Sequence, residues 1–173
     1  AFKLIELNQK FKFIKNDSNL LDIGSFPGGW SQVSSKIIIS GKILSVDLRK
    51  IEKIKNVSFL QCNFLNQDSK DQIFNFFNEK IDVIISDMAA DTTGNKALDC
   101  IRTNQLCADV IEFSSKNLKP KGILVSKLFM GEDFIEVKNL AKSKFKKVQF
   151  FKPKASRNES KETYLHCAVL KTL

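Results

Sequence analysis

The sequence predicts an α/β protein with a doubly wound, seven-stranded mixed sheet whose last strand is antiparallel. Short apolar or β-branched runs alternate with stretches of helical spacing, a pattern typical of parallel βαβ units. The chain then ends in two strand-like runs that a polar loop joins without a helix, which predicts an antiparallel hairpin. No repeat or Pro/Gly/Ser-rich linker divides residues 1–173, so we expect one domain.

The elements are expected in the following order. AFKLIELNQKF opens an N-terminal helix with a basic face, over about residues 1–15. The parallel strands are expected from NLLDIG (19–24), KILSVDL (42–48), VSFLQCNF (57–64), IDVIISDM (81–88) and GILVSKLF (122–129). The helices between them are expected from GGWSQVSSKIII (28–39), SKDQIFNFFNEK (69–80), NQLCADVIEFSSKNL (104–118) and EDFIEVKNLAKS (132–143). The hairpin is expected from FKKVQFFK (145–152) and TYLHCAVLK (163–171), the latter inserted antiparallel in the sheet.

The charge favours a polyanionic partner such as RNA, DNA or an acidic membrane face. The net charge is +9 at pH 7 and the pI is near 9.4. Basic residues are concentrated between Lys138 and Lys161, where Glu159 is the one acid. Composition alone leaves a solvated basic face as the alternative.

Other classes of protein are excluded by what the sequence lacks. No apolar run approaches the ~20 residues of a membrane span. The four cysteines (Cys62, Cys100, Cys107 and Cys167) form no C-x-x-C pair and His166 is the single histidine, so we expect free thiols, a reducing cytoplasm and no metal site.

The chain starts at Ala1 rather than Met, which predicts that natural N-terminal residues are missing.

A glycine-rich turn, LDIGSFPGGWSQV (21–33), follows the first strand. We expect its glycines, Gly24, Gly28 and Gly29, to adopt positive φ and to let the backbone approach a ligand closely. Its G-x-x-x-G-G spacing differs from the G-x-G-x-x-G fingerprint of dinucleotide sites. Asp47 ends the second strand, 23 residues after Gly24, where a carboxylate can accept both ribose hydroxyls of an adenosine. These features favour S-adenosylmethionine as the ligand, and an ordinary strand-to-helix turn is the alternative.

Five ordered motifs give nearly the whole chain a family resemblance. They are LDIGSFPGGWSQV, the strand-end Asp47, ISDMAADTTG, LVSKLFMGEDF and KPKASRNESKETY. Together they resemble the FtsJ/RrmJ-type RNA ribose 2′-O-methyltransferases. The resemblance implies a Rossmann-like class I S-adenosylmethionine-dependent methyltransferase fold and a Lys-Asp-Lys-Glu catalytic tetrad, which matches Lys3, Asp87, Lys127 and Glu162.

The same resemblance implies a cofactor site on the glycine turn and the strand ends. Gly28 and Trp30 would contact the methionine end of the cofactor, although Trp30 has a core position as its alternative. The whole expected set is Gly24, Ser25, Pro27, Gly28, Gly29, Trp30, Asp47, Leu48, Asn63, Phe64 and Asp87. Asn63 departs from the family, which has an acid there, so we expect its carbonyl to face the adenine and binding to be retained but weakened.

The predicted fold lets the tetrad meet at one edge of the sheet. Asp87 and Lys127 are expected to end parallel strands, and Glu162 to begin an antiparallel one, so all three reach the same edge. A helix from Lys3 to about Ile14 would return Lys3 to that edge. We hypothesise that Lys127 takes the proton of a ribose hydroxyl while the two carboxylates orient it.

RNA is expected to lie across this edge. Its phosphates would be met by Lys10, Lys12, Lys152, Lys154, Arg157 and Lys161. Tyr164 and Phe129 are candidates for stacking a base, with a place in the core as the alternative, and His166 is expected to be packed or on the surface.

The resemblance implies 2′-O-methylation of a uridine in large-subunit (23S) ribosomal RNA, by a cytoplasmic monomer that acts during ribosome assembly. A tRNA or cap-type target is one alternative, and a non-catalytic RNA-binding protein that senses S-adenosylmethionine is another. Base-amino methylation is disfavoured because Asp87-Met88-Ala89-Ala90 lacks the prolines of an N/D-P-P-aromatic motif. The net charge of +9 argues against a small-molecule substrate.

Overall fold

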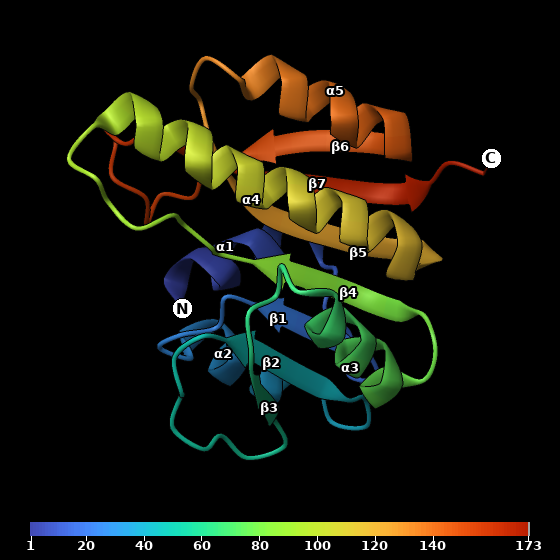
Figure 1. The fold of residues 1–173 in the computed structure, drawn as a ribbon. Helices are drawn as coiled ribbons and strands as arrows, with labels where there is room; N and C mark the ends of the chain where they lie inside the picture. Colours follow the sequence, from blue (N-terminus) through green and yellow to red (C-terminus); the bar gives the residue numbers. More distant parts are fainter. Residues whose placement is uncertain (173) are drawn as a thin grey trace.

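The computed structural model describes residues 1–172 and contains one mixed sheet with helices on both faces (Figure 1). The strands are β1 Leu20–Ile23, β2 Ile43–Asp47, β3 Ser58–Gln61, β4 Ile81–Ser86, β5 Leu118–Phe129, β6 Phe145–Phe151 and β7 Glu162–Leu170. The helices are α1 Phe2–Phe11, α2 Gly29–Ile37, α3 Gln67–Phe77, α4 Lys96–Asn117 and α5 Phe134–Lys144.

The strand order is β3-β2-β1-β4-β5-β7-β6, which confirms the predicted architecture. Strands β1 to β5 pair in parallel, and β7 lies antiparallel between β5 and β6. The order reverses between β1 and β4, and ligands of doubly wound sheets bind at the carboxyl ends of the strands beside such a reversal. The segments that follow β1 and β4 are therefore the expected place for a ligand.

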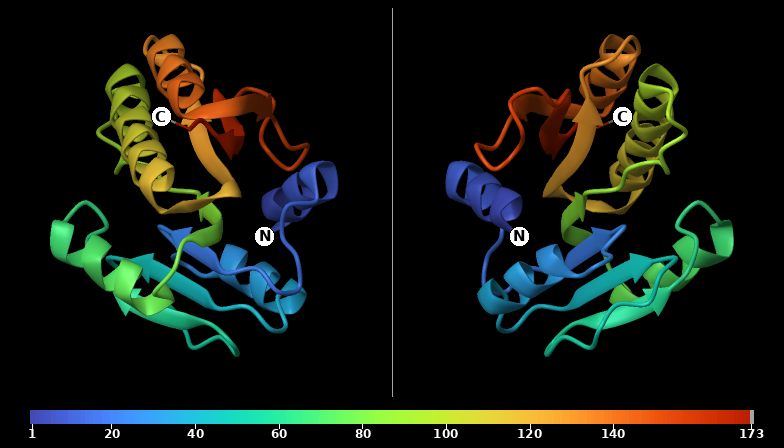
Figure 2. Two further views of the ribbon diagram at one scale, coloured as in Figure 1. Left: turned by 90° about the vertical axis from the view of Figure 1, so that its right-hand side faces the viewer. Right: turned by 90° about the vertical axis from the view of Figure 1, so that its left-hand side faces the viewer.

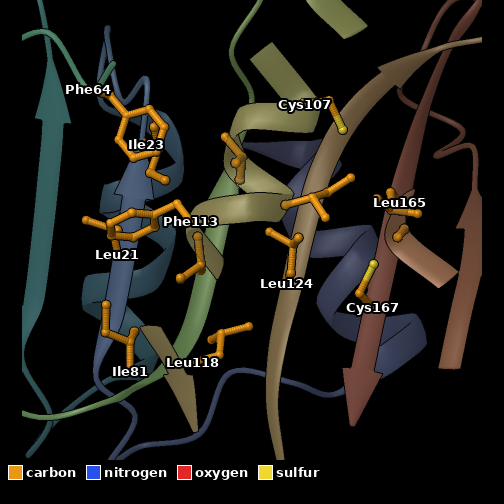
Figure 3. Packing of buried hydrophobic residues seen from close by; sticks show 14 of the residues in the cluster. Leu21, Ile23, Phe64, Ile81, Cys107, Phe113, Leu118, Leu124, Leu165 and Cys167 are labelled. Atoms are coloured by element: carbon orange, nitrogen blue, oxygen red, sulfur yellow. The ribbon is translucent and has the colours of Figure 1, made fainter. Parts of the chain in front are cut away.

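Two hydrophobic clusters hold the layers together. Helices α3, α4 and α5 cover one face of the sheet, and α1 and α2 cover the other (Figure 2). Leu21 and Ile23 of β1 belong to the cluster on the first face, together with Phe113 of α4 (Figure 3). Leu4 and Leu7 of α1 belong to the cluster on the second face. The alternation along each strand supplies both clusters, because successive side chains point to opposite faces.

Several predicted boundaries were wrong: α3 ends at Phe77 rather than Lys80 and β5 begins at Leu118 rather than Gly122. Local hydrogen bonds explain three further differences. Helix α4 begins eight residues before the predicted start at Asn104, since Asn95 caps it by accepting a hydrogen bond from the Leu98 N–H at 3.2 Å. Helix α1 ends at Phe11 rather than Ile14, because the Asn8 side chain accepts from the N–H groups of Phe13 and Ile14. Strand β3 ends at Gln61, and Asn63 forms a turn by accepting from the Leu65 N–H at 3.0 Å.

The glycine turn has the conformation that its sequence suggested at two of its three glycines. Gly24 has φ +74° and Gly28 has φ +117°, in the region that favours glycine. A Cβ on Gly24 would also lie 2.2 Å from Cγ of Met88. Gly29 does not adopt a positive φ and instead begins α2, which corrects the expectation for that residue.

Candidate active site

The four residues of the expected tetrad lie together at the carboxyl edge of the parallel strands. Asp87 directly follows β4, Glu162 is the first residue of β7, and Lys3 lies in the first turn of α1. Lys127 does not end β5 as expected. It pairs with Tyr164 inside the sheet, and β5 continues to Phe129, which pairs with Glu162.

The tetrad alternates in charge. The Lys127 Nζ lies 3.3 Å from Asp87 Oδ1 and 3.6 Å from Glu162 Oε2. The Lys3 Nζ donates a hydrogen bond to Glu162 Oε1 at 2.7 Å. The side chains of Lys127 and Glu162 are each 11% exposed, whereas Lys3 and Asp87 are about a third exposed. Each buried charge thus has an opposite charge beside it, as burial requires.

Opposing influences act on the Glu162 carboxyl. Burial by itself raises its pKa, but the hydrogen bond from Lys3 and the charges of Lys127 and Lys3 outweigh burial. The net result is a pKa below the usual value for glutamate. Glu162 therefore stays ionised and can hold both lysines.

Tyr164 joins the two carboxylates of the tetrad, a role that sequence reasoning missed. Its hydroxyl lies 2.5 Å from Asp87 Oδ1 and 3.0 Å from Glu162 Oε1. Burial and the charges of these two acids raise the pKa of the phenol, so it keeps its proton. The side chain is fully buried, so of the two alternatives for Tyr164 the structure supports the place in the core rather than stacking on a base. The signal in the sequence was its position two residues after Glu162, which places both on one face of β7.

Two cavities flank Asp87 and Gly24. The smaller, of about 290 Å³, is lined by residues that include Lys3, Asp22 and Trp30, and the larger, of about 640 Å³, by residues that include Asp47 and Phe64. Every residue of the expected cofactor set lines one or both of them, except Gly28. Gly28 instead approaches Ile54, whose Cδ1 would lie 3.3 Å from an added Cβ.

Asp22 is a second residue that sequence reasoning missed. It lies in β1, 1% exposed, and its Oδ2 accepts a hydrogen bond from the Ser31 hydroxyl at 2.7 Å. Its Oδ1 is buried without a hydrogen-bond partner within residues 1–172. Burial raises its pKa to about 7, and the charges of Asp87 and Asp47 add to this effect. A buried carboxylate without a full set of partners beside a cavity suits an ammonium group of a ligand.

The remaining residues of the expected cofactor set divide into polar and apolar contacts. Asp47 accepts hydrogen bonds from the N–H groups of Phe26 at 2.9 Å and Arg49 at 2.8 Å, which orients its carboxylate on the larger cavity. Phe64 is 5% exposed and Leu48 is 65% exposed on the same lining. Trp30 is 6% exposed and tilts against Tyr164, with ring centroids 5.6 Å apart, so it is both a core residue and part of the smaller cavity.

These observations fit S-adenosylmethionine. The orphaned Asp22 oxygen suits its ammonium group, Asp47 suits ribose hydroxyls, and the apolar side of the larger cavity suits an adenine ring. The close approach of Gly24 to Met88 leaves no room there for a side chain. Residues 1–172 hold no cluster of His, Cys, Asp or Glu suited to a metal ion.

The basic loop between β6 and β7 lies against α1 (Figure 2). Glu6 of α1 accepts hydrogen bonds from the N–H groups of Lys154 at 2.6 Å and Ala155 at 2.9 Å. Ala155 also lines the smaller cavity. The loop carries four of the six expected RNA-contacting residues, all exposed: Lys152, Lys154, Arg157 and Lys161.

The other two expected RNA contacts lie elsewhere. Lys10 is exposed in the last turn of α1. Lys12 follows α1 and lines a cavity at the amino edge of β4 and β5, so the expectation that it lies at the tetrad edge is wrong. The reason is that a ten-residue helix is about 15 Å long and carries the chain from one edge of the sheet toward the other. His166 is 8% exposed and stacks on Phe11, as a packed histidine.

The chain is similar to known methyltransferases. The family model of the FtsJ-like methyltransferases matches residues 1–170. The "Ribosomal RNA large subunit methyltransferase E" of Pelagibacter ubique is 43% identical over 171 residues, which cover 99% of this chain and 84% of that protein. The protein of the same name from Rickettsia akari is 44% identical, over 95% of this chain and 75% of its own length.

Solved structures show the same fold. A Plasmodium falciparum protein described as a ribosomal RNA methyltransferase superposes with a TM-score of 0.85 at 29% identity, covering 98% of this chain and 95% of that one. Human methyltransferase-like protein 13, solved in complex with SAH, superposes with a TM-score of 0.73 at 13% identity, covering 98% of this chain and 82% of that one. At that identity the likeness concerns the fold alone.

Proposed function

The chain belongs to the FtsJ-like methyltransferase family, and we propose that it methylates a ribose 2′-hydroxyl of large-subunit (23S) ribosomal RNA, with a uridine as the target. The observation that carries the proposal is the alternating cluster of Lys3, Glu162, Lys127 and Asp87 beside a cavity that fits the cofactor. The names of the 43–44% identical relatives support large-subunit ribosomal RNA as the substrate.

The cofactor is S-adenosylmethionine, which supplies an electrophilic methyl group on a sulfonium when it is bound. We propose that Asp22 faces its ammonium group, Asp47 its ribose hydroxyls and Phe64 its adenine. Asn63 uses its side-chain oxygen to accept from the Leu65 N–H. This bond engages the carbonyl that was expected to face the adenine amino group. We propose that the carbonyl accepts from that amino group only with its second lone pair, and that cofactor affinity is weaker than with an acid at this position.

Lys127 accepts the proton of the 2′-hydroxyl in this proposal. In this step the 2′-hydroxyl proton would pass to the Lys127 Nζ as the ribose oxygen bonds to the methyl carbon. The bond between that carbon and the sulfonium sulfur would break, and S-adenosylhomocysteine would leave. The ammonium that results is stabilised by Asp87 at 3.3 Å and Glu162 at 3.6 Å. Lys3 supplies a second positive charge, so that two lysines balance the two carboxylates. The Tyr164 hydroxyl fixes the separation between the Asp87 and Glu162 carboxylates. The main contribution of the protein is alignment of the reacting oxygen.

The exposed loop beside the tetrad binds the RNA backbone near the methylated ribose. Lys152, Lys154, Arg157 and Lys161 supply positive charge within the segment that leads directly into Glu162. Phosphate contacts of this kind position a nucleic acid without reading its bases.

Methyl transfer to RNA tests the proposal directly. Labelled S-adenosylmethionine is incubated with unmodified large ribosomal subunits and with bulk tRNA, and the modified nucleotide is mapped. We expect label on a ribose 2′-oxygen of the large-subunit RNA, and we expect Lys127→Ala to lower kcat by roughly 10²–10⁴-fold. Lys53→Ala, at an exposed lysine outside the site, serves as the matched control.

The outcomes separate the alternatives. Cofactor binding without transfer to any RNA would identify a binding protein, and label on tRNA alone would change the substrate. Near-normal turnover of Lys127→Ala would refute the role of Lys127 as base.

We further propose that residues 1–173 act as one methyltransferase domain, as a cytoplasmic monomer. Every strand of residues 1–172 belongs to a single sheet, which supports the single domain. No helix within those residues is long and apolar enough to cross a membrane. Light scattering of the purified chain tests the monomer, and fractionation of cells tests the location.

A further inference from the structure

A second basic region lies at the opposite edge of the sheet from the tetrad. A cavity of about 430 Å³ opens there, between the beginnings of β4 and β5 and the segment that joins α1 to β1. Asp82 lies at this edge and Asp87 at the tetrad, and five residues of extended chain span about 17 Å. The residues that line this cavity include Lys12, Lys15, Lys119, Lys121, Phe11, Phe13 and His166.

Strand pairing adds Lys147 to this region. Lys147 of β6 lies opposite Ala168 of β7, which lies opposite Ile123 of β5. Residues opposite one another in antiparallel strands share a face of the sheet. Since Ile123 lines the cavity and Lys147 is exposed, the Lys147 side chain extends the basic region along the α1 side of the sheet.

Most of this positive charge is uncompensated. Lys119 pairs with Asp82 at 3.0 Å and with Glu79 at 3.6 Å. Within residues 1–172 the other four lysines form no ion pair, and Asp17 is the remaining acid on the lining. The four are Lys12, Lys15, Lys121 and Lys147. Like charges that lie near one another repel, and a polyanion would relieve this repulsion.

Aromatic side chains form the inner wall of the cavity. Phe11 stacks on His166 with ring centroids 4.0 Å apart and planes 10° apart. Burial lowers the pKa of His166 to about 4, so its imidazole is neutral near pH 7. The charge of the region therefore comes from lysines on long, mobile stems, which suits a phosphate backbone better than a small ligand of fixed shape.

We propose that Lys12, Lys15, Lys121 and Lys147, the distal basic surface, bind the phosphate backbone of an RNA segment remote from the methylated ribose. The proposal rests on the RNA methyltransferase activity proposed above. A substrate as large as ribosomal RNA can reach both edges of the sheet, whereas a short oligonucleotide bound at the tetrad cannot.

The salt dependence of RNA binding tests the distal basic surface. The test variant is Lys121→Gln with Lys147→Gln, and the control is Lys53→Gln with Lys142→Gln, which removes two exposed lysines elsewhere. Each lost contact with single-stranded phosphate lowers the slope of log K against log salt by about 0.7, so we expect a decrease of roughly 1.4 in the test variant alone. The Kd for naked large-subunit RNA is measured between 50 and 200 mM salt, a range over which phosphate contacts have a large effect.

Three further measurements sharpen the test. We expect the test variant to raise KM for long RNA several-fold with kcat unchanged, to bind a short oligonucleotide like wild type, and to regain wild-type affinity when both positions carry arginine. Its melting temperature and its affinity for S-adenosylmethionine show that it is folded.

The outcomes distinguish this proposal from the proposed function. A wild-type protein that methylates no RNA refutes the function itself. Wild-type methylation with the same salt slope in test variant and control refutes the distal basic surface alone. Weaker binding to assembled subunits with unchanged binding to naked RNA also refutes it, because the partner would then be a protein.

Discussion

Single side chains at the tetrad depend on one another for hydrogen bonds and for charge compensation. Glu162 accepts from Lys3 and Tyr164 on the same oxygen, and Lys127 lies between the two carboxylates. Removing one member leaves another partly buried group without its partner, which costs more than the contact itself contributes. Conservative changes are therefore the informative ones at this scale.

Tyr164→Phe tests the bridge between the carboxylates. The variant keeps the ring in the core but loses the hydroxyl that contacts Asp87 and Glu162. Hydrogen bonds to charged groups contribute about 1.5–3 kcal/mol, so we expect kcat to fall by roughly 10- to 100-fold while KM for both substrates stays constant. Steady-state kinetics checks this, and an unchanged kcat would show that the hydroxyl does not position the tetrad.

Asp22 makes the stability of the cofactor-free protein depend on pH. Its folded-state pKa of about 7 lies above the ordinary 3.8, so the folded protein holds a proton that the unfolded chain has released between these values. The free energy of unfolding therefore falls as pH rises from about 4 to about 7, by up to about 1.4 kcal/mol per pH unit, and then levels off. Urea denaturation of wild type and Asp22→Asn at pH 5, 6, 7 and 8 measures this. Equal pH profiles for the two proteins would contradict it.

At the scale of elements, helix α1 and the loop between β6 and β7 form one unit although 148 residues separate Glu6 from Lys154. The Glu6 carboxylate binds backbone N–H groups of the loop, so the lysine side chains of the loop remain available to RNA. A carboxylate that accepts two backbone N–H groups makes strong, charge-assisted hydrogen bonds.

Glu6→Ala is expected to release this loop. KM for RNA should rise several-fold, since the basic residues would have to be ordered on binding. Trypsin should cleave faster after Arg157, which is exposed in the loop. Glu136→Ala removes an exposed acid from α5 on the other face and should change neither measurement. If Glu6→Ala shows the wild-type rate of trypsin cleavage and the wild-type KM for RNA, the loop keeps its conformation without the Glu6 side chain.

For the molecule as a whole, α1 is both part of the core and part of the proposed site. Leu4 and Leu7 are fully buried against the second face of the sheet, while Lys3 between Phe2 and Leu4 reaches Glu162. The same packing that stabilises the fold thus sets the position of a tetrad residue.

Leu7→Ala is expected to lower stability and activity together. Truncation of a fully buried leucine costs about 2–5 kcal/mol, and looser packing of α1 should weaken the contact of Lys3 with Glu162. Ile5→Ala changes a residue of the same helix that is 39% exposed and should have a small effect on both. Chemical denaturation and methyl-transfer rates at 25 °C check this. Full activity in a destabilised Leu7→Ala would separate the two roles of α1.

The sequence by itself determined the class of fold and the antiparallel hairpin that ends the sheet, and it supplied the four residues of the expected tetrad through a family resemblance. Alternating patterns record which face of each strand is buried, and glycines at positive φ leave a local signature at Gly24 and Gly28. The resemblance to the family selected Lys3 and Glu162, which lie 159 residues apart.

Only the tertiary structure decided which other side chains complete the site. Four features depend on segments that are distant in the chain. They are the two contacts of the Tyr164 hydroxyl, the unpartnered oxygen of Asp22, the hydrogen bonds between Glu6 and the loop, and the position of Lys12 at the far edge of the sheet. Local patterns report burial and backbone conformation, whereas hydrogen-bond partners and charge environments arise when the elements pack. The hydrogen bonds and charges at this edge of the sheet are therefore decided by the packing of the folded protein.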